Sequence, residues 1–450
     1  MTTNSNAPNE MGTADIGKLL ISYALPSIAA QMVSSIYNVV DSIFIGRGVE
    51  PLAIAGFGIT LPLMNLAGAF GSLVGAGGGT LISIKLGQKD KDGANNVLGN
   101  VVVLNIIIGL TVMIFGLTFM DKILMLFGAS ENTISFARDF MQIILLGNVI
   151  THLYFGLLCA VRSSGFPKKA MAITMSSVVV NIILCPIFIF VLQLGIKGAA
   201  LATVIAQASG LTILIIHFLD KQKYIRLYSK FLKLQKEIVK GIISVGLSPF
   251  MLNICACLVV IIVNNQLKIY GGDYAIGAYG VVNKMLMLFA MLVLGLNQGM
   301  QPIAGYNFGA KKYSRVIEVF KKTVFLATCV MITAFIVCEI FPHAICSIFA
   351  DDKQMTDISA NAMRIMVLAF PIVGFQMVTS NFFQSIGKAV TAAILSTTRQ
   401  LLFLIPALLI LPKFFFLNGV WYSMPFSDIV STLLAVYLLR KQFRKLTIDN

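Results

Sequence analysis

Residues 101–120 read "VVVLNIIIGLTVMIFGLTFM", a run of twenty residues without a charged side chain. As an α-helix this run would be about 30 Å long, which is the thickness of the hydrocarbon layer of a bilayer. Because lipid cannot satisfy free backbone groups, an apolar segment of this length is stable in a membrane as a helix. The run therefore predicts a membrane-spanning helix.

The rest of the chain has the same character. Of its 450 residues, 57% are hydrophobic and 12% are charged, whereas a soluble domain is about 25% charged. The mean hydropathy of +0.87 disfavours a very apolar soluble protein. We expect an all-α polytopic membrane protein with twelve transmembrane helices. The expected helices are residues 16–45, 52–82, 96–120, 133–160, 169–193, 197–219, 238–267, 274–304, 316–341, 359–385, 389–411 and 418–439.

The net charge of +15 is an orientation signal and does not indicate a nucleic-acid partner. Most of the 34 Lys and Arg residues fall in loops on one side of the expected helices. Basic loops stay in the cytoplasm, so we expect both termini there.

The chain repeats itself at a shift of 222 residues, which predicts a duplicated architecture. Matching positions include Gly58 and Gly280, Gly77 and Gly299, Lys89 and Lys311, and Gly165 and Gly387. Each repeat has six helices, so both repeats enter the membrane from the same side. We expect two six-helix lobes, 1–219 and 241–450, related by a pseudo-twofold axis along the membrane normal. Such paired halves favour a transporter that works by alternating access.

The linker between the lobes, residues 220–240, reads "DKQKYIRLYSKFLKLQKEIVK" and is strongly basic. Its apolar residues at helical spacing favour an amphipathic segment that lies on the inner leaflet. A solvated connector is the alternative interpretation.

Asp41 and Asp428 lie well inside expected helices, where ionisable residues are rare and functional. Asp41 belongs to the outer half of the first span, six residues before Arg47. Removal from water disfavours its charged form, so Asp41 is a candidate group for taking up and releasing a proton. The alternative is a carboxylate whose hydrogen bonds fix neighbouring helices.

Lys284 lies near the middle of the eighth expected helix, and Asp428 lies at a similar depth in the twelfth. We hypothesise that they pair. Such a pair would be structural, or it would exchange a proton or bind an anionic substrate group. Further polar side chains inside expected spans are candidates for lining a substrate cleft: Gln31, Tyr37, Asn253, Asn264 and Gln298.

Four stretches in order resemble one known family. They are "ALPSIAAQMVSSIYNVVDSIFIGR" from residue 24, "RSSGFPKKAM" from 162, "NIILCPIFIF…GIKGAALATVIAQ" from 181, and "QPIAGYNFGAKKYSRV" from 301. The chain resembles multidrug and toxic compound extrusion (MATE) transporters over nearly its whole length, and within them the MepA-like bacterial group. The resemblance implies export of drugs or metabolites, often organic cations, driven by inward flow of H⁺ or Na⁺.

The resemblance also implies that Asp41 is the cation-coupling carboxylate, with Asn181 and Thr203 as partners. Related proteins have an acidic residue one helical turn after the asparagine, whereas this chain has Cys185. A Na⁺ site would therefore have one carboxylate in place of two, which favours H⁺ as the coupling ion, with weak Na⁺ binding as the alternative. Cys185 itself is interpreted as a packed small residue.

The sequence contains no catalytic constellation and no nucleotide-binding loop, which disfavours an enzyme or an ATP-driven pump. We expect no cofactor and no metal beyond the coupling ion, a drug-like substrate, contact with membrane lipid, and a monomer. One alternative is a flippase for lipid-linked precursors from the same superfamily. Another is an integral-membrane scaffold or receptor, which would need no coupling ion.

Overall fold

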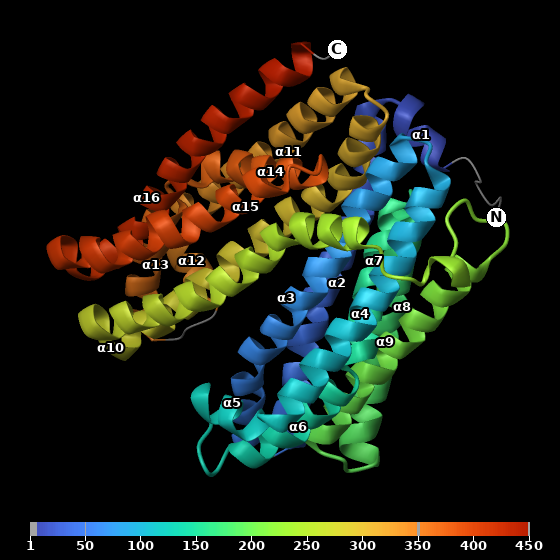
Figure 1. Ribbon diagram of the computed structural model, residues 1–450. Coiled ribbons are helices and arrows are strands. Elements are labelled where there is room, and N and C mark those ends of the chain that lie inside the picture. The colour runs from blue at the N-terminus through green and yellow to red at the C-terminus, as the bar shows by residue number, and fades with distance from the viewer. Residues whose placement is uncertain (1–6, 50, 349–351, 449–450) are drawn as a thin grey trace. The chain divides into compact units, whose positions relative to one another are not determined.

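The computed structural model describes residues 7–49, 51–348 and 352–448, except for the side chains of 7–9, 37–39, 47, 51, 447 and 448. Within these ranges the regular structure is helical, with no strand (Figure 1). The predicted all-α class is confirmed. The class is all-α because a helix satisfies every backbone group within its own segment, as a membrane-spanning chain requires.

The first half of the chain forms helices that follow the predicted spans within a few residues. A short α1 (Ala7–Thr13) comes before the first span. The others are α2 (Ile16–Gly48), α3 (Pro51–Gly87), α4 (Lys91–Thr118), α5 (Met120–Leu126), α6 (Ile134–Leu146), α7 (Asn148–Ser163), α8 (Pro167–Pro186) with the π-helix η1 (Ile187–Val191), and α9 (Ile196–Leu219).

The second half follows the same plan. After the 3₁₀ turn η2 (Ser229–Phe231) its helices are α10 (Lys236–Gly309), α11 (Tyr313–Ile340), α12 (Pro342–Ser347), α13 (Lys353–Val367), α14 (Phe370–Ser385), α15 (Ala389–Thr397) with the π-helix η3 (Thr398–Leu404), and α16 (Ile405–Ile448).

The span count agrees with the twelve predicted. Among the described residues, eight helices are long and apolar enough to cross a membrane, or ten if each of two bent pairs is one span. Two of the eight, Lys236–Gly309 and Ala389–Leu446, have 74 and 58 residues, far more than the roughly 20 that one crossing of a bilayer requires. Each contains a residue with non-helical angles, Gly272 or Phe416. Counting each of these as two spans gives twelve.

Backbone angles recur at corresponding positions of the two sequence repeats. Lys89 and Lys311, 222 residues apart, have φ of 59° and 58°. Gly195 has φ 56° and ψ −136°, and Phe416, 221 residues later, has φ 53° and ψ −134°. The bends in the two broken spans, 55° for α6–α7 and 57° for α13–α14, also correspond. These unusual angles coincide in the two halves because both halves fold by the same local plan.

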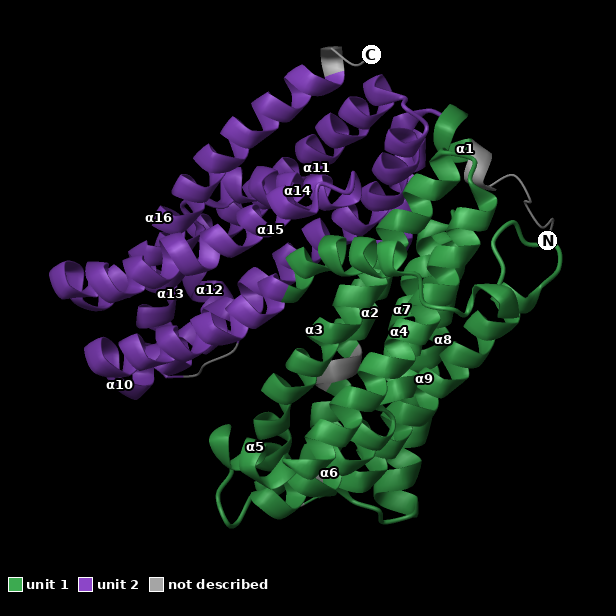
Figure 2. Cartoon of the chain, viewed as in Figure 1, with its two compact units in different colours: residues 1–14, 29–250 green, residues 15–28, 251–450 purple. Residues whose placement is uncertain are grey.

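By packing, the chain divides into two compact units (Figure 2). Unit 1 comprises Met1–Ala14 and Ala29–Phe250, and unit 2 comprises Asp15–Ile28 and Met251–Asn450. The beginning of α2 therefore packs with unit 2, and the beginning of α10 packs with unit 1. The lobes 1–219 and 241–450 with a linker at 220–240 stay a prediction from the repeat, since packing divides the chain at other residues.

Small residues explain why these two helix beginnings pack where they do. In unit 2, a Cβ at Gly299 would lie 2.7 Å from the Cα of Ala24. In unit 1, a Cβ at Gly246 would lie 1.7 Å from the backbone oxygen of Leu73. The backbones approach so closely that a side chain has no room, which is the packing that small residues allow between membrane helices.

Up to residue 235 the predicted linker does not form a regular helix, and its place on the inner leaflet stays a prediction. Between α9 and α10 the chain is irregular apart from η2, and its backbone is hydrogen-bonded to side chains of α4. Sequence periodicity alone suggested a helix, but tertiary contacts to asparagines override that preference. This segment, residues 220–235, is called the strap below.

Phe416 generates the first testable prediction. Its backbone angles belong to a region that is almost exclusive to glycine and costs other residues about 1–3 kcal/mol, and its counterpart in the repeat is Gly195. The side chain is 70% exposed, so its removal loses little packing. We expect Phe416→Gly to raise the free energy of unfolding by about 1 kcal/mol after the entropy cost of glycine. The measurement is the thermal unfolding midpoint of the purified protein.

The neighbouring Phe415 provides the control, because it is also exposed but lies in regular helix. Phe415→Gly should lower the midpoint, since glycine weakens a helix by about 1 kcal/mol. Equal destabilisation by both substitutions would show that the angles of Phe416 carry no strain.

Candidate functional site

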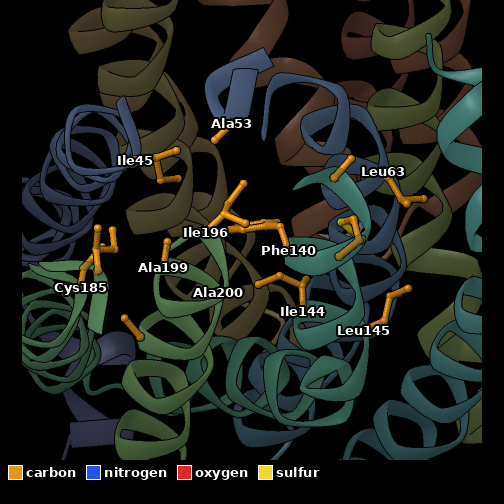
Figure 3. Packing of buried hydrophobic residues seen from close by; sticks show 14 of the residues in the cluster. Ile45, Ala53, Leu63, Phe140, Ile144, Leu145, Cys185, Ile196, Ala199 and Ala200 are labelled. Carbon is orange, nitrogen blue, oxygen red and sulfur yellow. The ribbon is translucent and has the colours of Figure 1, made fainter. Parts of the chain in front are cut away.

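Asp41 lies on α2 within the apolar interior of unit 1, with 7% of its surface exposed. One turn later, Ile45 belongs to a buried cluster with Cys185 of α8 and Ala199 of α9 (Figure 3). The ring of Phe44 meets that of Phe190 edge-on at a centroid distance of 6.4 Å. The three helices therefore enclose the level of Asp41 with hydrocarbon.

The Cys185 thiol lies within electrostatic reach of the Asp41 carboxylate. Cys185 is fully buried in the apolar cluster, as a packed small residue would be. The structure adds that this packed residue lies beside the carboxylate. A single sequence shows that position 185 lies one turn after Asn181, but not which residue of another helix it faces.

Asn181 and Thr203 are brought together as predicted. The Nδ2 of Asn181 donates to the Oγ1 of Thr203 at 3.4 Å, and that hydroxyl donates to the Ala199 carbonyl at 3.1 Å. Asn181 is 1% exposed, and within the described residues no donor reaches its Oδ1. A buried acceptor without a partner is costly in a native protein and calls for an explanation such as an absent proton donor or ion.

Asp41, Cys185, Asn181 and Thr203 are called the N-half cluster below. Asn181 and Cys185 are four residues apart on α8 and share a face of the helix. The cluster offers one carboxylate, one thiol, one amide oxygen and one hydroxyl. Within the described residues, no group of three or more His, Cys, Asp or Glu side chains is arranged to hold a metal ion.

In unit 2 the predicted pair of Lys284 and Asp428 is wrong. Asp428 pairs with Arg399, whose Nε lies 2.7 Å from its Oδ1. Lys284 is exposed, and no ion pair of the described side chains includes it. Lys284 was predicted as the partner of Asp428 only because the two residues lie at a similar depth in their expected spans. The observed partner, Arg399, lies on a helical segment that packs beside Asp428.

Arg399 is the functional candidate that sequence reasoning missed. It lies ten residues into the expected helix 389–411. That position was the signal that could have identified it. Arg399 lies in η3, and π-helical turns within α-helices are frequent at functional sites. The Asp428 side chain is 6% exposed and that of Arg399 is 28% exposed, so the carboxylate is the more deeply buried partner.

The predicted cleft residues are placed as follows. Gln31 lies in unit 1 and is partly buried. Asn253, Asn264 and Gln298 lie on α10 in unit 2 and are partly buried as well. The side chain of Tyr37 lies outside the described residues. A cleft formed by residues of both units stays a prediction.

The ion pair in unit 2 generates the second testable prediction. Arg399→Gln leaves the Asp428 carboxylate buried without its counter-charge, which typically costs about 3–5 kcal/mol. The double variant Arg399→Gln/Asp428→Asn removes both charges and should recover most of that loss. Thermal unfolding of the single and double variants in detergent measures the coupling.

Lys284→Gln is the matched control, because it removes one positive charge from the same unit without breaking an ion pair of the described residues. It should change stability by less than about 1 kcal/mol. Additive losses for Arg399 and Asp428, with no recovery in the double variant, would contradict the pairing.

Comparison with known proteins identifies the family to which the chain belongs. The family model MatE matches residues 26–187 and 246–409, which together make up more than half of the chain. Two successive matches agree with the duplication that the sequence and the backbone angles indicate.

Similar proteins cover nearly the whole chain. Multidrug export protein MepA of Staphylococcus haemolyticus is 29% identical over 437 residues, 97% of this chain and 96% of that protein. MepA of Staphylococcus aureus is 27% identical over 436 residues, 96% and 95% of the two chains.

Solved structures show the same fold. A crystal structure of MATE in the bent conformation has a TM-score of 0.93 at 22% identity, and covers 99% of each chain. An outward-facing multidrug resistance MATE family transporter of the MOP superfamily has a TM-score of 0.92 at 22% identity, also over 99% of each. With its duplicated helical halves and a family match in both of them, the chain belongs to the MatE family.

Proposed function

We propose that this protein is an H⁺-coupled antiporter that exports drug-like, often cationic, small molecules by alternating access. The relatives named as multidrug export proteins align along at least 95% of their own length. The duplicated architecture supports the mechanism, because two equivalent halves allow a central site to open to either side of the membrane in turn.

One observation supports H⁺ as the coupling ion: position 185, close to the buried Asp41 carboxylate, has a neutral thiol where a second carboxylate could stand. A proton needs a single carboxylate and no coordination shell. Na⁺, a hard cation, requires several oxygen ligands, and a thiol is a poor substitute for carboxylate oxygen. The charge of the N-half cluster thus changes by one unit when Asp41 is protonated.

Na⁺ coupling is the second candidate, and the uncommitted Oδ1 of Asn181 favours it. That oxygen, with the Thr203 hydroxyl and the Asp41 carboxylate, would supply oxygen ligands from three helices. Asn181 is held next to Thr203 by their hydrogen bond. The cluster would then hold Na⁺ weakly, with one negative charge in place of two.

A flippase for lipid-linked precursors is a less favoured alternative. Such a substrate is anionic and requires uncompensated positive charge near the middle of the membrane. Arg399 is positive, but Asp428 neutralises it within the same unit. Lys284 is the other basic side chain inside the expected core of a span, and a single lysine does not make the strongly cationic cleft that such a substrate requires.

The proposal includes a location and an assembly. The excess of basic residues on one side of the spans supports a cytoplasmic location of both termini, by the positive-inside rule, and the bacterial relatives support an inner membrane. A monomer is sufficient, since both halves are in one chain. The lobes 1–219 and 241–450 are proposed as the two halves that exchange access.

The third prediction concerns Asp41. In proteoliposomes with an imposed ΔpH, inward H⁺ flow should drive efflux of a cationic dye by the wild type. Asp41→Asn should reduce the rate at least about tenfold, since the amide has the shape of the carboxylate but does not ionise at physiological pH.

An imposed ΔNa⁺ without ΔpH is the parallel measurement. Efflux driven by ΔNa⁺ and indifferent to ΔpH would overturn H⁺ coupling and leave drug export intact. Efflux by Asp41→Asn at the wild-type rate under ΔpH would instead exclude Asp41 as the coupling group.

The fourth prediction concerns Cys185. Cys185→Asp adds a second carboxylate next to Asp41, which should create Na⁺-stimulated efflux that the wild type lacks. Cys185→Asn, similar in size and neutral, is the matched control and should stay insensitive to Na⁺. Identical Na⁺ responses of the two variants would show that the charge at position 185 does not select the ion.

A further inference from the structure

The strap, residues 220–235, is an ordered structure held on α4 by asparagine side chains. The Arg226 backbone N–H donates to the Oδ1 of Asn95 at 2.9 Å, and that of Gln235 donates to the Oδ1 of Asn100 at 2.9 Å. The Gln235 side chain donates to the Oδ1 of Asn96 at 3.0 Å. A strap fixed at both ends keeps its side chains at a constant level along α4.

The strap contacts α4 at the boundary between the polar beginning of this helix and its apolar part. The helix begins with Lys91 and Asp92, and after Asn100 comes the charge-free run 101–120. A Cβ at Gly99 would lie 2.2 Å from the Phe231 backbone oxygen, so the strap touches the helix at this point. In a bilayer the end of a charge-free run lies where hydrocarbon meets headgroups.

The side chains of the strap suit this boundary. Leu232 and Leu234 are 41% and 45% exposed, although they are apolar. Between and beside them, Lys230, Lys233 and Lys236 are exposed as well. An exposed leucine at the headgroup level can enter the acyl region, while a lysine beside it reaches the headgroups.

Aromatic rings and charge complete the surface. The Lys230 Nζ lies 4.3 Å from the Phe231 ring centroid, and the Arg226 guanidinium lies 4.9 Å from that of Tyr228. Among the described side chains, no ion pair neutralises the three lysines; Glu237 is the acidic residue next to Lys236. The surface is therefore cationic, with apolar and aromatic groups interleaved.

We propose that residues 230–236 form an anchor that binds anionic phospholipid headgroups of the leaflet next to the start of α4. Charge complementarity selects the occupant, since three exposed lysines and two exposed leucines lie beside the polar end of the charge-free run of α4. Each lysine near an anionic surface strengthens the attraction, and the effect falls off within a Debye length. The proposal is independent of the coupling ion and of the exported substrate.

Native mass spectrometry of the purified full chain, titrated with phosphatidylglycerol or phosphatidylcholine, tests the anchor. The wild type should retain phosphatidylglycerol at least about tenfold more tightly, and the preference should weaken in high salt. Lys230→Gln/Lys233→Gln/Lys236→Gln should lose most of it. A preference that does not respond to salt would overturn the proposal.

The matched control, Lys441→Gln/Arg444→Gln/Lys445→Gln, removes the same charge from exposed positions near the end of α16. It should keep the preference for phosphatidylglycerol. Leu232→Ser/Leu234→Ser should weaken retention of both lipids while the preference remains. Equal loss in the two triple variants would show a general charge effect and no anchor.

Discussion

A carboxylate inside a membrane-spanning bundle has to be neutralised, by a proton or by a partner, because lipid and apolar side chains do not solvate its charge. The two halves of this chain meet that requirement differently. Asp428 has the Arg399 guanidinium at 2.7 Å, so its charge is balanced within the protein. Asp41 lies beside the neutral Cys185 thiol, which supplies no positive charge. On our proposal, a proton neutralises Asp41 during part of the transport cycle.

This chemical asymmetry is built on a symmetric backbone. The left-handed residues Lys89 and Lys311 recur with nearly the same angles, and so do Gly195 and Phe416. The family model also matches each half separately. Duplication preserved the turns and bends that the fold requires, while the ionisable side chains diverged. On our proposal, one half exchanges the coupling ion and the other holds a fixed ion pair.

Much of the fold was predictable, because length and lack of charge define a membrane helix locally. The run 101–120 needed no tertiary information, and most predicted spans begin and end near the end of an observed helix or near the breaks at Gly272 and Phe416. The contact between Asn181 and Thr203 agrees with their predicted depth, and their role stays a prediction. The site was not predictable where a contact joins distant helices, as between Cys185 and Asp41 or between Arg399 and Asp428. The strap was missed for the same reason, since its asparagine partners lie about 130 residues earlier, with sequence separations of 131 and 135.

The central claim is that Asp41 exchanges a proton when substrate binds, and counting protons tests it most directly. A pH-indicator dye in lightly buffered detergent solution reports protons released when a cationic substrate is added to the purified protein. The account predicts release of about one proton per chain near neutral pH for the wild type and none for Asp41→Asn, with no change when Na⁺ is added. Equal release from both proteins, or release by the wild type on addition of Na⁺ alone, would contradict it.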